Sequence, residues 1–213
     1  METVSLQMKD VAYESGQPIE YAYFPLTGVA SLVTVMENGS AVEVATIGNE
    51  GMVGLPLFLG VNRTAGRAFT QVPGDSIRIP AHVFQEEVRR SSELTTMLQL
   101  YTQALIVQIS QSLACNGIHT LRQRCARWLL MTHDRVAADR FPLSQEFLAE
   151  MLGVRRQSVS KIASFYQDEG MIRYSRGTIQ FLDRPRLEKA SCECYEVIQK
   201  EFERLLGAPQ KQG

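Results

Sequence analysis

The chain has 213 residues and a formal net charge of −1. This length allows one large or two modest domains, each able to bury its own core. No apolar run approaches the length of a membrane span and no signal peptide opens the chain, so we expect no membrane association. The four cysteines are too few for a disulfide framework in a chain this long, which favours the reducing cytoplasm as location.

Charge is distributed unevenly along the chain. Residues 1–90 contain six Lys or Arg against ten Asp or Glu, a net charge of −4, whereas residues 119–184 contain eleven against seven, a net charge of +4. The near-neutral total by itself points to no particular partner. An acidic first part and a basic second part indicate that only the second part meets nucleic acid.

Residues 4–79 show short β-rich runs separated by turns. Residues 14–18 read as a turn, and Asn38-Gly39 predicts a two-residue hairpin loop between two of the runs. Many short strands at near-regular spacing predict a small antiparallel barrel or roll. Strands are expected at 21–24, 28–35, 41–47, 67–72 and 76–79.

The interval from Gly48 to Arg67 is the exception within this part. Its glycines would let the backbone approach a ligand closely, and Arg67 would meet an anion there. The same glycines also suit loops that turn the corners of a barrel. The bare pattern is more typical of the second interpretation.

Two helices are predicted after the strands. A short one is expected at 81–90 and a longer one at 92–116, which Gly117 should break. Apolar residues cover most of the circumference of the longer helix, so it needs more than one partner. One side would lie on the barrel and another on a second copy of the chain, as in a two-stranded coiled coil. The alternative is a core helix within a single chain.

A further helix is expected from His119 to Val136. Its apolar face consists of Leu121, Cys125, Trp128 and Leu129. Three arginines fall outside this face, and we expect them to be solvated or in salt bridges: Arg122, Arg124 and Arg127.

The stretch from Leu143 to Gly170, LSQEFLAEMLGVRRQSVSKIASFYQDEG, carries two short amphipathic helical patterns. Ser144 stands at the N-cap of the first pattern, and a tight turn at Gly153-Val154 separates the two. Two helices joined by a glycine-containing turn, the second polar and basic, predict a helix-turn-helix. In the second helix the residues expected to face inward are Val159, Ile162, Ala163 and Tyr166.

Two β-rich runs, 171–174 and 178–182, follow and predict a hairpin, so the unit is a winged helix with Arg173 and Arg176 at the wing tip. Arg and Lys neutralise phosphates and can fork onto guanine, while Gln can pair with adenine. Residues 155–161 alone would equally suit a solvated helix face, but the wing favours DNA binding. The predicted DNA contacts are Arg155, Arg156, Gln157, Ser158, Ser160, Lys161, Arg173 and Arg176.

Asp183 is placed to cap a last helix, predicted to run from about Pro185 to Leu206. Cys192 and Cys194 form a C-x-C pair, not the paired C-x-x-C of a zinc site. We therefore expect structural cysteines and no metal site, with metal binding or redox sensing as the alternative. Residues from Gly207 onward are expected to form a disordered tail.

The order of barrel, long helix and winged helix resembles the Crp/Fnr family of bacterial transcription regulators over nearly the whole chain. ESGQPIEYAYFPLTGVASL is similar to the first half of a cyclic-nucleotide-binding roll, and LSQEFLAEMLGVRRQSVSKI matches the helix-turn-helix of the family. The resemblance implies an α+β fold with an N-terminal antiparallel β-roll. Its expected parts are an effector-sensing roll at 1–90, a dimerisation helix at 91–117, a winged helix-turn-helix DNA-binding domain at 118–184, and a C-terminal helix and tail at 185–213.

The resemblance places Arg156, Gln157 and Lys161 at the three positions that usually read bases. The middle position is commonly Glu in the family, so Gln157 implies a different half-site and favours adenine over cytosine. Arg155 stands where a small capping residue is more usual.

The sensing end departs further from the family. Relatives that bind cyclic AMP have a Gly-Glu pair for the ribose and an Arg-Ser or Arg-Thr pair for the phosphate, and here these pairs are Gly54-Leu55 and Arg67-Ala68. Leu55 cannot accept the ribose hydrogen bond, and an unpaired buried hydroxyl costs about 1–3 kcal/mol. We therefore expect an unidentified small-molecule effector and not cyclic AMP. Because no cysteine precedes Cys115, an iron–sulfur cofactor of the fumarate-nitrate type is not expected either.

Together, the residues and the resemblance predict a cytoplasmic, homodimeric transcription regulator that reads a near-palindromic double-stranded DNA site and contacts RNA polymerase. The alternative is a ligand-binding signalling module whose winged helix meets protein instead of DNA. An enzyme is not expected, because the sequence shows no clustered nucleophile, base and orienting group.

Overall fold

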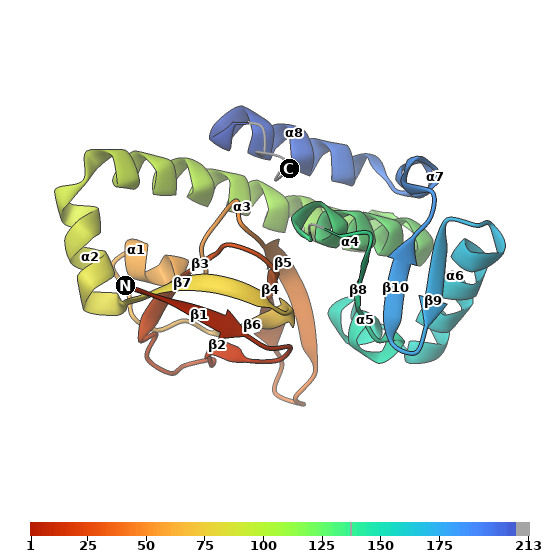
Figure 1. Ribbon diagram of the computed structural model, residues 1–213, viewed down its shortest axis with the longest axis horizontal. Coiled ribbons are helices and arrows are strands. Elements are labelled where there is room, and N and C mark those ends of the chain that lie inside the picture. Colours follow the sequence, from red (N-terminus) through yellow and green to blue (C-terminus); the bar gives the residue numbers. More distant parts are fainter. Residues whose placement is uncertain (137, 208–213) are drawn as a thin grey trace.

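The computed structural model describes residues 1–136 and 138–207 of the chain. Its N-terminal part is the predicted antiparallel roll, with strands β1 (Glu2–Leu6), β2 (Val11–Tyr13), β3 (Tyr21–Pro25), β4 (Val29–Val35), β5 (Ala41–Ile47), β6 (Gly66–Val72) and β7 (Gly74–Pro80). The strands form two sheets with the orders β1-β7-β3 and β2-β6-β4-β5. Figure 1 shows both sheets together on one side of the long helix that follows them.

The β4–β5 hairpin is confirmed, but its loop differs from the prediction. The Met36 amide donates to the Ser40 carbonyl (2.8 Å) and the Gly39 amide donates to the Met36 carbonyl (2.9 Å). Glu37, Asn38 and Gly39 therefore form a three-residue loop instead of a two-residue one. Gly39 takes the left-handed conformation (φ 81°) at which such loops usually place glycine.

Three helices belong to this half of the chain: α1 (Leu55–Phe58), α2 (Ala81–Arg90) and α3 (Ser92–Ile118). The predicted bounds of α2 are confirmed. The prediction that Gly117 breaks α3 is wrong, because the helix passes through Gly117 and ends at Ile118, followed by extended His119 (φ −90°, ψ 150°). One glycine lowers helix stability by only about 1 kcal/mol, so the packing of α3 can outweigh it.

The next part of the chain is the winged helix, made of α4 (Leu121–Arg135), β8 (Arg140–Pro142), α5 (Gln145–Met151), α6 (Arg156–Asp168), β9 (Ile172–Ser175) and β10 (Thr178–Phe181). Helix α4 starts later than predicted, because Thr120 forms a capping box with Gln123. The short strand β8 was missed by the sequence analysis. It pairs with β10 and completes a sheet of order β8-β10-β9.

The prediction of one unbroken C-terminal helix is wrong. Asp183 caps a helix as expected, accepting from the Arg186 amide (3.0 Å), but Ser191 and Cys192 are extended and divide the segment. The break lets the second helix lie along α3 (Figure 1). The two helices are α7 (Arg184–Ala190) and α8 (Glu193–Leu206). Of the predicted disordered tail, residues 208–213 lie outside the described residues.

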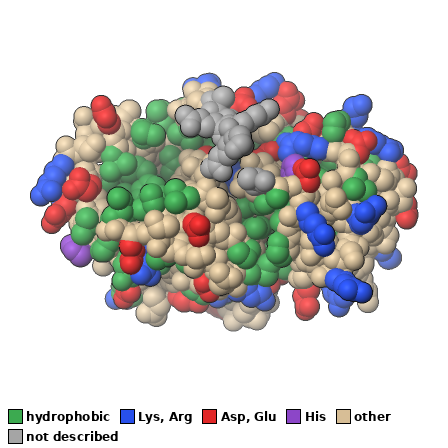
Figure 2. All heavy atoms as spheres, viewed as in Figure 1, with side chains coloured by type: hydrophobic (Ala, Val, Ile, Leu, Met, Phe, Trp, Pro, Cys, Tyr) green, Lys and Arg blue, Asp and Glu red, His purple; other side chains and the backbone are tan. Residues whose placement is uncertain are grey.

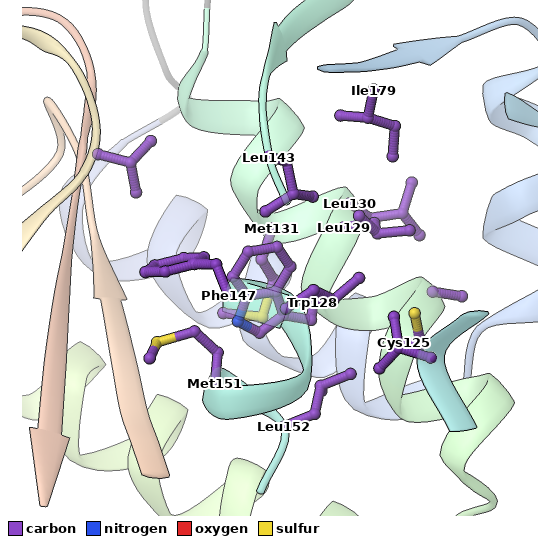
Figure 3. Close-up of a cluster of buried hydrophobic side chains, with 14 of the residues drawn as sticks. Cys125, Trp128, Leu129, Leu130, Met131, Leu143, Phe147, Met151, Leu152 and Ile179 are labelled. Carbon is purple, nitrogen blue, oxygen red and sulfur yellow. The ribbon is translucent and has the colours of Figure 1, made fainter. Parts of the chain in front are cut away.

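One hydrophobic core extends from the roll into the winged helix (Figure 3). Trp128 and Leu129 of α4 and Phe147 and Met151 of α5 are buried in it together with residues of β4, β5 and β6. The Phe69 ring of β6 meets the Phe147 ring edge-on, with the ring centroids 6.0 Å apart. In this structure the helix-turn-helix is therefore packed against the roll.

A half-buried glutamate lies where the roll meets α4. Glu43 of β5 accepts hydrogen bonds from the Trp128 indole (2.7 Å), the Ser31 hydroxyl (2.5 Å) and the Thr46 hydroxyl (2.9 Å). Burial raises the pKa of Glu43 to about 7, and these three hydrogen bonds oppose the shift without cancelling it. The carboxyl group therefore changes charge near neutral pH at the joint between the two parts.

Two arginines of α4 take part in packing, contrary to the prediction that they are solvated or in salt bridges. Arg127 is buried, and its guanidinium donates to the Ser112 hydroxyl of α3 (3.1 Å). Arg124 donates to the Asn116 side chain (2.9 Å) and to the Leu152 carbonyl (2.8 Å). These bonds join α4 to α3 and to the helix-turn-helix. Among the helices of the described residues, none is long and apolar enough to span a membrane.

Candidate nucleic-acid interface

The helix-turn-helix is built as its sequence predicts. The Ser144 hydroxyl caps α5 by accepting from the Phe147 amide (3.1 Å). Gly153 takes φ 65°, a conformation that glycine adopts without steric strain. The Val154 amide donates to the Ala149 carbonyl (2.9 Å) and closes the turn. The residues of α6 that were predicted to face inward are buried or half-buried: Val159, Ile162, Ala163 and Tyr166.

The outer face of α6 is polar and basic. Arg156, Gln157 and Lys161 are all exposed, and at about 100° per residue they share an arc of roughly 140° around the helix axis. Arg155 is exposed at the N-cap position and makes no capping hydrogen bond there. Its side chain is therefore free to contact a ligand at the start of α6, on the same basic surface as Arg156, Gln157 and Lys161.

The two serines of the predicted contact set are half-buried. The Ser160 hydroxyl donates to the Gln145 side chain (2.6 Å) and so ties α6 to the first residue of α5. Ser158 lies in the first turn of α6, where its amide donates to the Arg155 carbonyl (2.9 Å). The sequence analysis missed the part that Gln145 plays, because a polar residue after an N-cap gives no sign of a partner fifteen positions later.

The wing is the hairpin of β9 and β10. Its turn residues, Arg176 and Gly177, both have positive φ (48° and 75°), as a type I′ turn requires. Arg176 is therefore at the tip, as predicted, and its side chain is exposed. Arg173 is exposed too, but it pairs with Gln180 in the strand ladder, so it lies on β9 and not at the tip.

The cations of this surface have no acidic partners among the described residues. Nearby Arg184, by contrast, forms ion pairs with Asp134 (2.5 Å) and Glu188 (2.9 Å). Figure 2 shows Lys and Arg side chains spread over the winged-helix end of the molecule, and unpaired cations there suit a polyanion. Within the described part of the chain, no carboxylate lies within ion-pair distance of Arg155, Arg156, Lys161, Arg173 or Arg176.

The four predicted effector residues do not all face the same surroundings. Gly54 (φ 100°) precedes α1 and Leu55 begins it, while Ala68 is fully buried inside the roll. Arg67 is the neighbour of Ala68 on β6, and neighbouring residues of a strand point to opposite faces of the sheet. The Arg67 guanidinium forms an ion pair with Glu14 (3.0 Å). In this structure the charge of Arg67 is therefore neutralised by Glu14 and not by a bound anion.

The roll also contains a small apolar cavity. Its volume is about 20 Å³, which is near the space that one water molecule needs. Sites for small organic ligands occupy roughly 300–1,000 Å³. In this conformation the cavity does not admit a nucleotide. It is lined by residues of β1, β2, β3, β4, β6 and β7, among them Tyr23, Phe69 and Val72, and by Val53, which precedes α1.

A roll, a long helix and a winged helix with an unpaired basic face define a regulator in which a sensing domain is joined to a DNA-binding domain. Comparison with family models agrees: the cyclic nucleotide-binding domain matches residues 3–91, and the Crp-like helix-turn-helix domain matches residues 123–190. The chain belongs to the Crp/Fnr family of bacterial transcription regulators. Proteins of this family are transcription regulators and not enzymes.

Solved structures share the fold of this chain. FixK2 from Bradyrhizobium japonicum aligns with a TM-score of 0.75 and 18% identity, over 90% of this chain and 97% of that one. A CRP/FNR-family transcriptional regulator from Thermus thermophilus aligns with a TM-score of 0.73 and 24% identity, over 89% of this chain and 98% of that one. At these identities the likeness establishes the fold alone. No curated protein sequence matches the chain.

Proposed function

We propose that the protein is a homodimer that reads a near-palindromic DNA site, with one α6 helix of each copy in a major groove. A two-fold dimer presents the same reading surface twice, so the two half-sites mirror the symmetry of the protein. The observation that carries this proposal is an exposed apolar stripe on α3, in a chain whose α6 face is basic and unpaired.

The stripe lies on the side of α3 that neither the roll nor α8 covers. Leu100, Ile106 and Leu113 are 37%, 52% and 75% exposed. Leu100 and Val107 are seven residues apart, and so are Ile106 and Leu113, which is the repeat of a two-stranded coiled coil. An apolar stripe of this kind marks an interaction surface, and a second α3 would bury it symmetrically.

The α6 face then supplies sequence readout. Arg156 would fork onto guanine O6 and N7, Gln157 would pair with adenine, and Lys161 would meet guanine or a phosphate. Arg173 and Arg176 on the wing would contact the sugar–phosphate backbone, where they release counterions without reading sequence. The two α6 helices of a dimer would enter major grooves about 34 Å apart, one helical turn of DNA.

Replacing Arg156 by alanine should cost about 1–3 kcal/mol of specific binding, because a bidentate base contact is lost. Fluorescence anisotropy with the target duplex and with a non-specific duplex measures this loss. Lys189→Ala, which removes an exposed cation from α7, is the matched control and should leave both affinities unchanged. Unchanged affinity of the Arg156→Ala protein for its target would refute the base contact.

Replacing Arg176 by asparagine should weaken binding to all duplexes alike. Asparagine tolerates the positive φ of the turn, so the change removes the charge and keeps the wing. The slope of log affinity against log salt concentration should become shallower by about one unit, because one phosphate contact is lost. A salt titration of affinity measures the slope, and a variant with the wild-type slope would remove Arg176 from the interface.

The sensing roll carries the regulatory part of the proposal. Leu55 and Ala68 lack the polar groups that would hold a cyclic nucleotide, which supports an effector other than cyclic AMP. Such an effector would stabilise one of two arrangements in which the winged helix packs against the roll. The family further supports a protein of the bacterial cytoplasm that acts together with RNA polymerase.

A further inference from the structure

Three cysteines and one histidine from distant parts of the chain meet where α3 ends. Cys115 and His119 lie four residues apart at that end, on one side of the helix, and Cys192 and Cys194 lie at the start of α8. Their sulfur and ring nitrogen atoms all lie within 4.8 Å of one another. The three thiols are buried and form a cluster of their own, apart from the two large cores.

Two distances within this cluster are close to those between ligands of one ion, and the other ligand atoms all lie within 4.8 Å of one another. The Cys115 and Cys192 sulfurs are 3.5 Å apart, and the Cys194 sulfur is 3.5 Å from His119 Nδ1. A tetrahedral zinc ion, with bonds of about 2.3 Å to sulfur and 2.0–2.1 Å to nitrogen, separates two sulfurs by about 3.8 Å and a sulfur from a nitrogen by about 3.6 Å. The cluster therefore fits a single tetrahedral ion with little movement.

The histidine is held in the orientation that a metal ligand needs. Its Nδ1 faces the thiols, and its Nε2 is 3.2 Å from a carboxylate oxygen of Glu193, the residue between the two cysteines of the C-x-C pair. A metal-bound histidine characteristically donates its other ring N–H to a carboxylate, which fixes the tautomer. The Gln111 amide also donates to the Cys194 sulfur (3.3 Å). Both contacts stabilise ligands around the cluster.

Two other roles for the thiols fit less well. An iron–sulfur cluster spreads its ligands over two or more irons, whereas these four ligand atoms are close enough to share one ion. A disulfide between Cys115 and Cys192 would use two thiols, but it would not explain why His119 faces the thiols and contacts Glu193. The geometry favours a single ion over either.

We propose that Cys115, His119, Cys192 and Cys194 bind one tetrahedral, thiophilic divalent cation of the zinc type. A Cys₃His set with no open position is typical of a structural site. Each cysteine would bind as a thiolate, so its proton passes to solvent when the cation enters, and no oxidation is involved. The cation would tie the end of α3 to the start of α8, directly beside the joint from which α4 and the winged helix begin.

The test uses the full-length, reduced protein after removal of metal with a chelator. Cobalt(II) added without oxygen should produce the intense visible absorption of a tetrahedral site and a thiolate-to-cobalt charge-transfer band in the near ultraviolet. Titration should end at one cobalt per chain, and zinc should then displace it. Zinc should also raise the melting temperature of the metal-free protein, because a ligand that binds only the folded form stabilises it.

Variants separate this site from adventitious binding. Cys194→Ser should weaken the charge-transfer band, because one of the three thiolates is lost, and should lower the affinity for cobalt. Cys125→Ala should keep the full spectrum, because Cys125 is buried in the core shared by the roll and the winged helix, apart from the three clustered thiols. Glu193→Gln alters a largely exposed side chain (70% exposed), so it should fold normally and weaken cobalt binding about 10- to 100-fold. This variant keeps the proposal testable if Cys194→Ser fails to fold.

Three results would overturn the proposal. One is a fully reduced protein that yields no tetrahedral cobalt spectrum. Another is a spectrum that survives unchanged in both Cys194→Ser and Glu193→Gln. The third is a protein that is two hydrogen atoms lighter than its reduced mass and carries a Cys115–Cys192 link when purified under reducing conditions.

Discussion

Replacing Leu113 by glutamate should convert the proposed dimer into monomers and abolish tight binding to the target duplex. Leu113 is the most exposed of the three residues Leu100, Ile106 and Leu113 of the α3 stripe, at 75%. In a symmetric dimer the substitution places two carboxylates in one apolar interface, where an unpaired charge is strongly disfavoured. The dimer dissociation constant should rise by roughly 100-fold or more, which is about 3 kcal/mol or more.

Analytical ultracentrifugation over a range of concentrations measures this change, and anisotropy measures the accompanying loss of DNA affinity. Leu59→Glu is the matched control. Leu59 is also an exposed apolar residue, at 59%, but it lies in the roll directly after α1 and not on α3. The control protein should remain a dimer. If both variants dimerise like the wild type, α3 is not the interface.

Replacing Glu43 by glutamine should change how stability depends on pH. The folded-state pKa of Glu43, about 7, lies above its ordinary value of 4.5, so the folded protein holds this proton more tightly than the unfolded chain. The resulting stability is fully present below pH 4.5 and is lost as the pH rises to 7. The loss amounts to about 3 kcal/mol over this window. Glutamine never ionises, so the variant should not lose it.

Denaturant unfolding at pH 5 and pH 8 gives the relevant difference. The free energy of unfolding of wild type should fall by about 2.5 kcal/mol more between these values than that of Glu43→Gln. Glu37→Gln, in the exposed β4–β5 loop, should follow the wild-type curve. Parallel curves for wild type and Glu43→Gln would show that the carboxyl group titrates normally. Glu43 of the roll accepts a hydrogen bond from Trp128 of α4. Protonation of Glu43 would therefore also change the contact between the roll and the winged helix.

Local patterns in the sequence were enough to predict most of the fold. Alternating strands, the Ser144 cap, the turn at Gly153 and the Arg176-Gly177 wing turn each depend on residues close together in the chain, and all are present in the structure. The errors concern competition between local and tertiary effects. Gly117 stays helical because α3 is supported by packing, and an extended link at Ser191 and Cys192 splits the last helix.

The candidate sites divide along the same line. The predicted DNA-contact residues lie on one helix face and one hairpin, so their spacing along the chain predicts where they lie. The position of the proposed metal cluster cannot be predicted in this way, because Cys115 and Cys192 are 77 positions apart. The C-x-C pair was noticed in the sequence, and the one further signal was Cys115 and His119 at helical spacing. Only the return of α8 along α3 brings the two pairs together.

The most direct test of the central claim is to select duplexes that the full-length protein binds from a random-sequence pool, and then to measure the mass of the complex. We expect a near-palindromic site with half-sites about one helical turn apart, two protein chains on each duplex, and an affinity that falls steeply with salt. A protein that stays monomeric and selects no sequence, with duplex binding absent even at low salt, would contradict the claim and favour a winged helix that meets protein.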